Sequence, residues 1–387
     1  MLKGFKYRIY PTESQTELLN KHFGAVRFIY NLALETKLLA YNGNKVNLTR
    51  FDLQAQLIEL KKECPWLTEV NSQSLQSALM YLDRAFIAFF KGKAKFPTFH
   101  KKRNRQSFQC PQKVKVDKKG LWLPKFKEPI SIVLHRPFHG KIKTVTISKT
   151  PTDKYFASIL VDMPIVIPAK QPINNPVGID LGIKSFIVTS EGVKFDNPKY
   201  LQRSIDRLKI LQRRASKKVK GSHNRKKANK QVAVLYEKVT NQRNDFLHKL
   251  SDAITKQFDT ICIENLQVAN MVKNHHLARA ITDCGWSLFT DMLEYKSEWR
   301  GVNLIRIGTF DPSTKLCSVC GSINKELTLA DRVWTCSDCG TVLDRDVNAA
   351  VNILNFGLRI AGVERPGVRP ELPTMVGTMK GEKIITS

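Results

Sequence analysis

Four of the eight cysteines in this chain of 387 residues form two closely spaced pairs. Cys317 and Cys320 make one C-x₂-C pair, and Cys336 and Cys339 make a second one after fifteen intervening residues. This spacing is typical of a structural zinc site, in which each pair forms a tight turn that presents two thiolates to one tetrahedral ion. Gly321 follows the first pair and Gly340 follows the second, and glycine easily accepts a turn with positive φ at these positions. Redox-active pairs are the alternative.

The coordination shell and the other cysteines limit what this site can do. Four thiolates leave no open position, so we expect one structural Zn²⁺ and no catalysis by it. The remaining cysteines are scattered and expected to be packed: Cys64, Cys110, Cys262 and Cys284. No stretch approaches the roughly 18–20 apolar residues of a membrane span, and no long apolar segment follows the N-terminus. We therefore expect an intracellular protein with reduced thiols and no membrane partner.

The charge balance points to a polyanionic partner. Lys and Arg number 63 and Asp and Glu number 34, a formal net charge of +29. So much like charge repels itself unless an anion neutralises it, and nucleic acid is the usual partner. Lys91–Arg105 has seven basic residues and no acidic one, with Phe96, Phe99 and His100 between them for stacking on bases. Arg203–Lys230 has twelve basic residues and one acidic residue, Asp206. Solvated surfaces are the alternative interpretation of both.

From these two stretches we select the candidate phosphate contacts. They are Lys91, Lys93, Lys95, Lys101, Lys102, Arg103, Arg105, Arg213, Arg214, Lys217, Lys218, Arg225, Lys226 and Lys227.

The order of periodic segments predicts several domains. A strand over Lys3–Tyr10 precedes helical patterns after Thr12 and over Arg50–Glu63 and Ser72–Phe90. Short β-rich segments fill 106–165 and indicate a small barrel or sandwich that the first strand completes. After a proline-rich linker, strands and helices alternate along the rest of the chain. We expect a β-meander from Val177, one long helical stretch over Tyr200–Phe258 and a strand over Thr260–Glu264. Helices over Leu277–Arg300, a strand from Asn303 and a flexible tail over Arg359–Ser387 follow.

Three acids stand at the ends of such segments. Asp180 ends the strand VGID, Glu264 ends TICIE, and Asp346 opens a helix in DRDVNAAVNIL. A carboxylate there is costly unless it is paired or binds a cation. Together the three could hold two Mg²⁺ ions about 3.5–4 Å apart, as in phosphodiester hydrolysis. Each also has a structural alternative, as a turn, ion-pair or helix cap, and Asp344 competes with Asp346 for the third position.

These motifs carry a family resemblance. VGIDLGIKSF, ICIENL and FDPSTKLCSVCG…CSDCG…LDRDVNAAVNIL resemble the three split motifs of a RuvC nuclease with a zinc ribbon inserted before the third. That order, and FKYRIYPTESQTELLNKHFGAVRFIYN at the start, is similar to the TnpB proteins of bacterial insertion sequences, relatives of compact type V CRISPR nucleases. The resemblance spans most of the chain apart from the tail.

The resemblance implies a multidomain α+β protein with an RNase H-like (RuvC) α/β nuclease core, a zinc ribbon, a β-barrel wedge domain and an α-helical recognition lobe. The implied boundaries are 1–10 with 106–165 for the wedge domain, 11–105 for the recognition lobe, 175–311 and 343–358 for the nuclease core, 312–342 for the ribbon and 359–387 for the tail. The implied catalytic acids are Asp180, Glu264 and Asp346, and the implied zinc ligands are the four paired cysteines.

The resemblance also implies an activity and partners. TnpB proteins are RNA-guided DNA endonucleases: a transposon-end RNA guides them to duplex DNA beside a short motif. By this likeness we expect a monomer with one guide RNA, located in a prokaryotic cytoplasm near the nucleoid. We also expect the region of the following residues to contact the short motif beside the target: Tyr7, Arg8, Tyr10, Thr12, Ser14 and Gln15. Three alternatives stay open: a compact type V CRISPR effector, an RNA-guided DNA-binding regulator that does not cut, and, less favoured, a strand-joining transposase on the same fold.

Overall fold

The computed structural model describes residues 1–103, 105–309, 311–328 and 330–363, and the chain divides into two compact units. The first unit is Met1–Val166 and the second begins at Ile167, within the proline-rich segment. The expected tail falls almost wholly outside the described residues. No helix of the described residues is long and apolar enough to cross a membrane.

The first unit combines a helical region with an antiparallel sheet. Its strands are β1 (Leu2–Tyr10), β2 (Gln106–Cys110), β5 (Ser131–Val133), β6 (Lys141–Lys149) and β7 (Tyr155–Asp162), in the order β2-β6-β7-β1-β5, with a separate hairpin of β3 (Lys115–Asp117) and β4 (Gly120–Trp122). The first strand thus pairs with β7 and β5, which come from the far end of the unit, as the sequence predicts. Alternate residues of β1 point into the core, where Phe5, Tyr7 and Ile9 are buried.

The helices of this unit are α1 (Glu13–Asn44), α2 (Arg50–Glu63) and α3 (Ser72–Phe90), with a short 3₁₀ helix over Pro65–Glu69. Thr12 starts α1 through a capping box: its hydroxyl accepts the N–H of Gln15, whose side chain accepts the N–H of Thr12. Leu19 and Phe23 of α1 pack against the sheet, and later residues of the same helix pack against α2 and α3.

The second unit is built on a mixed five-stranded sheet. Its strands are β8 (Pro176–Leu181), β9 (Ser185–Thr189), β10 (Lys194–Asp196), β11 (Thr260–Ile263) and β12 (Asn303–Arg306), in the order β10-β9-β8-β11-β12. The meander of β8, β9 and β10 is antiparallel, whereas β8, β11 and β12 are parallel. A small hairpin of β13 (Val333–Thr335) and β14 (Val342–Asp344) lies between the cysteine pairs and the last helix, α9 (Arg345–Ile360).

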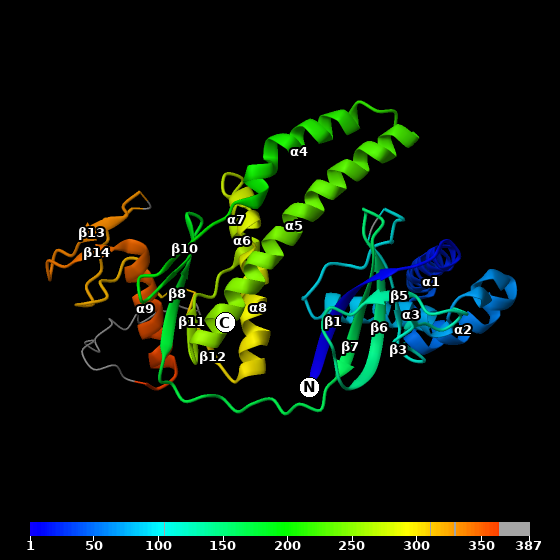
Figure 1. Cartoon of the computed structure of the whole chain (residues 1–387), viewed down its shortest axis with the longest axis horizontal. Helices are drawn as coiled ribbons and strands as arrows, with labels where there is room; N and C mark the ends of the chain where they lie inside the picture. The colour runs from blue at the N-terminus through cyan, green and yellow to red at the C-terminus, as the bar shows by residue number, and fades with distance from the viewer. Residues whose placement is uncertain (104, 310, 329, 364–387) are drawn as a thin grey trace, which may run out of the picture. The chain divides into compact units, whose positions relative to one another are not determined.

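The helices of this unit are α4 (Tyr200–Ser216), α5 (His223–Gln257), α6 (Val268–Met271), α7 (Ala278–Cys284), α8 (Trp286–Arg300) and α9. Figure 1 shows α5 and α8 on one face of the mixed sheet and α9 on the other. Ile179 and Ile263 point toward the α5–α8 face, and the alternate residue Cys262 points toward α9.

Two helix boundaries differ from the sequence prediction. The single stretch predicted over Tyr200–Phe258 is two helices joined by a turn in which Gly221 has φ +89°. The helices predicted over Leu277–Arg300 are α7 and α8, which meet at Gly285, with φ +72°. In addition, α9 continues to Ile360, past the start of the predicted tail, because its apolar face packs on the sheet through residues as late as Leu358.

Candidate functional site

Sheet register places two of the three predicted acids side by side. Ile179 of β8 is paired with Ile263 of the parallel strand β11, so the following residues, Asp180 and Glu264, are also neighbours. Side chains alternate along a strand, which puts Asp180 on the face of Gly178 and Glu264 on the face of Cys262, the face that α9 covers.

The third acid arrives with α9, and a glycine allows the close approach. A Cβ atom at Gly178 would lie 2.0 Å from the carbonyl oxygen of Ala350 and 2.7 Å from the backbone nitrogen of Leu354. Ala350 is about one turn after Asp346, so the first turn of α9 lies toward the Asp180 end of β8. The three acids come from segments far apart in the chain, and all three side chains are partly exposed.

Burial and neighbouring negative charge act together on Asp180 in this acid cluster. Burial, together with the negative charges of Glu264 and Asp346, raises the pKa of Asp180 to about 7, and Arg345 opposes the shift. Like charges held near one another at the edge of a core raise a carboxyl pKa in this way. A bound cation would relieve the repulsion, and carboxylate oxygens suit a hard ion such as Mg²⁺. The donor set therefore fits the predicted ion.

The structure distinguishes Asp344 from Asp346. One Asp344 oxygen accepts the N–H groups of Asp346 and Val347 at 3.1 and 3.0 Å, and the other lies 2.6 Å from Lys194 Nζ. Asp344 is therefore the N-cap of α9. The Asp346 carboxylate instead lies 3.0 Å from Arg345 Nη2 and 3.6 Å from Arg332 Nη1, and its charge acts on Asp180.

The four paired cysteines form the second candidate centre. Their sulfur atoms all lie within 4.8 Å of one another, a limit that the three carboxylates do not meet. Cys317 Sγ is 3.7 Å from Cys339 Sγ, and Cys320 Sγ is 3.6 Å from Cys336 Sγ. Tetrahedral Zn–S bonds of about 2.3 Å give S···S distances of about 3.8 Å, whereas a disulfide is about 2.05 Å. The four cysteines can therefore hold one metal ion between them.

Both cysteine turns are built in the same way. The N–H of Gly321 donates to Cys317 O and that of Gly340 to Cys336 O, each at 2.9 Å, and both glycines have positive φ, +82° and +69°. Only glycine adopts this conformation freely, as the sequence predicts. Trp334 is buried beside Cys317 and Cys336, so its role here is packing.

The predicted phosphate contacts occupy two regions, one in each unit. The candidates in Lys91–Arg105 all lie on the exposed chain between α3 and β2. Those in Arg203–Lys230 lie at the end of α4, in the turn, and in the first residues of α5, where Arg225 is half-buried and donates to Lys218 O. Figure 1 shows α4 and α5 as a long hairpin. In the described residues, none of these candidates is in an ion pair, so their charge is available to an anion.

One aromatic prediction is wrong in this structure, and a second aromatic residue already has a stacking partner. Tyr7 has no exposed surface, because it points into the sheet core and its hydroxyl donates to Arg136 O at 2.7 Å. His100 already stacks on Tyr30, with ring centroids 3.8 Å apart, which occupies one of its faces. Tyr10 is 53% exposed, and the Arg8 guanidinium lies 5.2 Å from its ring. Tyr10 and Arg8 stay candidates for nucleic-acid contact.

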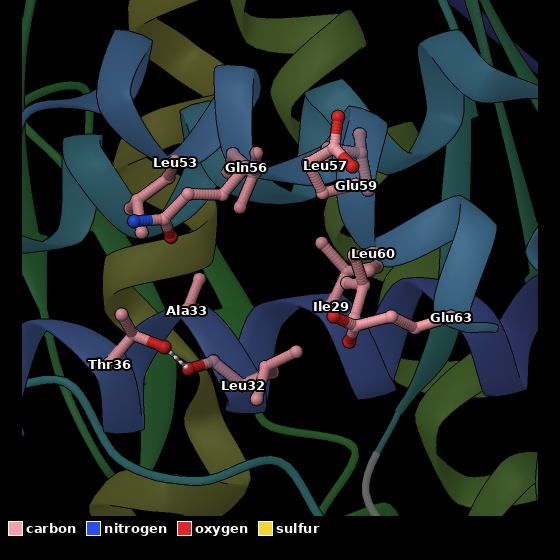
Figure 2. Close-up of a pocket in the computed structure, with 11 residues that line it drawn as sticks. Ile29, Leu32, Ala33, Thr36, Leu53, Gln56, Leu57, Glu59, Leu60 and Glu63 are labelled. Carbon is pink, nitrogen blue, oxygen red and sulfur yellow. Dashed lines mark hydrogen bonds between the residues drawn. The ribbon is translucent and has the colours of Figure 1, made fainter.

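An open groove between α1 and α2 has a volume of about 380 Å³. Figure 2 shows the side chains that line it. Its floor is apolar, with Ile29, Leu53 and Leu57, and Glu59 and Glu63 lie at its rim. Acidic rims repel phosphates, so this groove is not a candidate for nucleic-acid binding.

Sequence reasoning missed the residues that connect the two candidate centres. Ser313 donates to Glu264, and Asn348 and Asn352 donate to backbone carbonyls next to the first cysteine turn. The signal was present: two asparagines four residues apart share one face of a helix, and that face is expected to be buried.

Together, the fold and the two centres define a multidomain α+β protein with an acid cluster at the edge of a mixed sheet and a four-cysteine cluster. Family models match residues 1–45 ("Helix-turn-helix domain"), 153–275 (OrfB_IS605, "Probable transposase") and 286–353 ("Cas12f1-like, TNB domain"). Residues 1–45 fold here as a strand and one continuous helix.

The relatives extend over nearly the whole chain. A Streptomyces pristinaespiralis protein named "Putative RNA-guided DNA endonuclease" is 42% identical over 375 residues, 95% of this chain and 92% of the relative. An Escherichia coli K12 protein, "Putative RNA-guided DNA endonuclease InsQ", is 32% identical over 92% of each chain. A mimivirus "TnpB-like protein L79" is 27% identical over 92% of this chain and 73% of the relative. The chain belongs to the TnpB family.

A solved structure supports the fold. The Cas12f1 chain of a complex with sgRNA and target DNA superimposes with a TM-score of 0.56 at 15% identity, over 89% of this chain and 83% of that one.

Proposed function

We propose that this protein is an RNA-guided DNA endonuclease. The observation that carries the proposal is the 42% identity, over 95% of the chain, to a relative named for that activity. The three acids at one sheet edge support it, because they supply the chemistry that such a nuclease needs. The guide would be an RNA from the end of a transposon, and the substrate would be duplex DNA beside a short recognition motif.

We infer that the mixed sheet is an RNase H-like (RuvC) core. An antiparallel meander followed by two parallel strands, with the last helix across one face, supports this. The core would comprise 175–311 and 343–358, interrupted by a ribbon over 312–342. In the first unit, the antiparallel sheet would be the wedge domain and 11–105 the recognition lobe.

Asp180, Glu264 and Asp346 are proposed to hold two Mg²⁺ ions. When bound, such ions supply a nucleophile from water and stabilise charge on the leaving oxygen of a phosphodiester. The role of the protein is to hold the three carboxylates in place. Strand register fixes the backbone positions of Asp180 and Glu264, and the first turn of α9 fixes that of Asp346. Cys317, Cys320, Cys336 and Cys339 are proposed to hold a structural Zn²⁺.

The exposed basic segments are proposed to bind the guide RNA and the DNA through phosphates. Base pairing between RNA and DNA would then supply sequence specificity, while the protein contacts the backbones. The net charge of +29 suits two polyanions, and one RNA per monomer in a prokaryotic cytoplasm is the expected arrangement.

The test is to express the protein with its native flanking DNA, sequence the RNA that co-purifies, and reprogram that RNA against a plasmid. We expect one defined RNA that extends past the element boundary, and cleavage only of plasmids that carry the matching target. A CRISPR-repeat RNA would favour the type V effector alternative. Guided binding without cleavage at any Mg²⁺ concentration would favour the regulator, and guide-independent strand joining would favour the transposase.

A further inference from the structure

Ser313 contacts one of the three acids directly. Its Oγ donates a hydrogen bond of 2.5 Å to Glu264 Oε1, and its exposed fraction is 4%. Glu264 follows the end of β11, so strand register fixes its backbone but leaves its three side-chain torsions free. A buried hydroxyl bonded to one carboxylate oxygen limits those torsions, and the remaining lone pairs of the carboxylate stay available to a cation.

Ser313 is itself held by the helix that carries Asp346. Asn352 of α9, which is 2% exposed, donates from Nδ2 to Ser313 O at 2.8 Å and to Leu316 O at 2.7 Å. The N–H of Ser313 donates to Asp311 O at 2.8 Å. The backbone of Ser313 is therefore fixed, and helix α9, which carries Asp346, also sets the position of the Ser313 hydroxyl relative to Glu264.

The serine also lies at the start of the cysteine ribbon. Cys317 follows four residues later, and Asn348 ties the turn to α9 through Leu316 O at 2.7 Å and the N–H of Ser318 at 2.9 Å. A displacement of the first cysteine turn would therefore move Ser313 and, through it, Glu264. The ribbon and the acid cluster share a short chain of hydrogen bonds within one unit.

We propose that Ser313 is a positioning residue that orients Glu264 for cation binding in the acid cluster. This inference rests on the proposed metal-dependent function of that cluster. Partners that orient a metal-binding carboxylate typically affect metal affinity or activity by about 10- to 100-fold. A serine that only fills space would affect stability and leave metal affinity unchanged.

The experiment uses the full-length protein and three variants. Ser313→Ala removes the hydroxyl, Ser313→Thr keeps it, and Thr314→Ala removes the neighbouring hydroxyl, which makes no hydrogen bond to Glu264 in the described residues. Mn²⁺, which prefers the same oxygen ligands as Mg²⁺, is titrated into each protein without nucleic acid and followed by electron paramagnetic resonance. Zinc content is measured on the same samples.

We expect Ser313→Ala to weaken Mn²⁺ binding by about 10- to 100-fold at unchanged zinc content. The Mg²⁺ concentration for half-maximal cleavage should rise by a similar factor, with unchanged RNA binding. Ser313→Thr should recover most of the affinity, and Thr314→Ala should match the parent protein.

Parental Mn²⁺ affinity in Ser313→Ala would overturn the proposal. So would a loss of zinc in parallel with Mn²⁺, because the effect would then pass through the ribbon and not through Glu264. If the parent protein binds Mn²⁺ but cuts no guided target, the proposed function fails, while the Mn²⁺ titrations still decide the role of Ser313.

Discussion

The two candidate metal centres of the second unit are assembled in opposite ways. The four cysteines lie within 23 residues, Cys317–Cys339, and each turn forms from its own backbone and its own glycine. The three acids come from β8, from the end of β11 and from α9, and they meet only when the sheet is paired and the helix is docked.

This difference has a thermodynamic consequence. When thiolate ligands lie close together in the sequence, metal binding supplies most of the folding free energy of that segment, as in small zinc modules that are unfolded without the metal. The acids lower the stability of the metal-free fold, because the folded state buries the Asp180 carboxylate and holds it near Glu264 and Asp346, and both effects raise the pKa of Asp180. Changes that loosen packing should therefore damage the acid cluster first and leave the cysteine cluster able to bind metal.

The largest expected effect comes from Asp180→Ala. Loss of one ligand of a reaction-site metal removes about 4 kcal/mol of transition-state stabilisation, so guided cleavage should fall by about a thousandfold. RNA binding and zinc content should stay at parental levels, since neither depends on this carboxylate. Plasmid cleavage, RNA binding and elemental analysis measure the three quantities. Asp206→Ala, at an exposed acid of α4, is the control, and full activity of Asp180→Ala would refute the metal-site assignment.

The next effect is that of changing both Cys317 and Cys320 to Ser. Zinc content should fall from about one ion per chain to near zero, and cleavage should drop by roughly 10- to 100-fold, because the ribbon start supports Ser313 and α9. Elemental analysis and cleavage rates test this expectation. The paired change Cys64→Ser and Cys284→Ser, away from the cluster, should keep the zinc. Unchanged zinc in the first variant would contradict the ribbon assignment.

Gly178→Ala should affect the acid cluster and leave the cysteine cluster unchanged. Its Cβ would collide with the backbone of α9, so the helix must shift, at a cost of roughly 1–3 kcal/mol in unfolding free energy. Cleavage should fall about tenfold as Asp346 moves away from Asp180, a loss of about 1.4 kcal/mol. Zinc binding should be unaffected. Denaturant unfolding, cleavage rates and zinc analysis report these effects, and Gly4→Ala, at a strand glycine where nothing lies within 4 Å, controls for the loss of a glycine.

The smallest effect is expected for Asp344→Ala. It removes the α9 cap and the Lys194 ion pair, worth about 1 kcal/mol of stability, and leaves the reaction chemistry in place. Cleavage should change by about twofold or less, compared with a loss of about a thousandfold in Asp346→Ala. Parallel cleavage assays of the two variants decide which aspartate belongs to the acid cluster. Equal losses would mean that both carboxylates take part.

Much of this organisation could be predicted from sequence because the signals were local. The positive φ of Gly321 and Gly340 follows from the cysteine spacing, and the positions of Asp180 and Glu264 follow from where two apolar strands end. That the first strand joins the strands of the later β-rich segment could also be predicted, whereas its pairing with β7 and β5 comes from the structure.

The rest depends on contacts between distant residues. Alternation alone could not tell which face of the first strand is buried, and Tyr7 lies on that face. The break at Gly221 interrupts a pattern that continues as a helix on both sides. The choice between Asp344 and Asp346 required the geometry of the α9 start, where the first aspartate caps the helix.

The buried amides of Asn348 and Asn352 limit how this protein can be made smaller. Both are 2% exposed, and their partners are backbone groups at the ribbon start. A shortened version in which a plain loop replaced 312–342 would remove these backbone partners, and each amide that the new loop still covered would cost about 1–3 kcal/mol. Miniaturisation by ribbon deletion therefore has to give both asparagines new partners or exchange them in the same step.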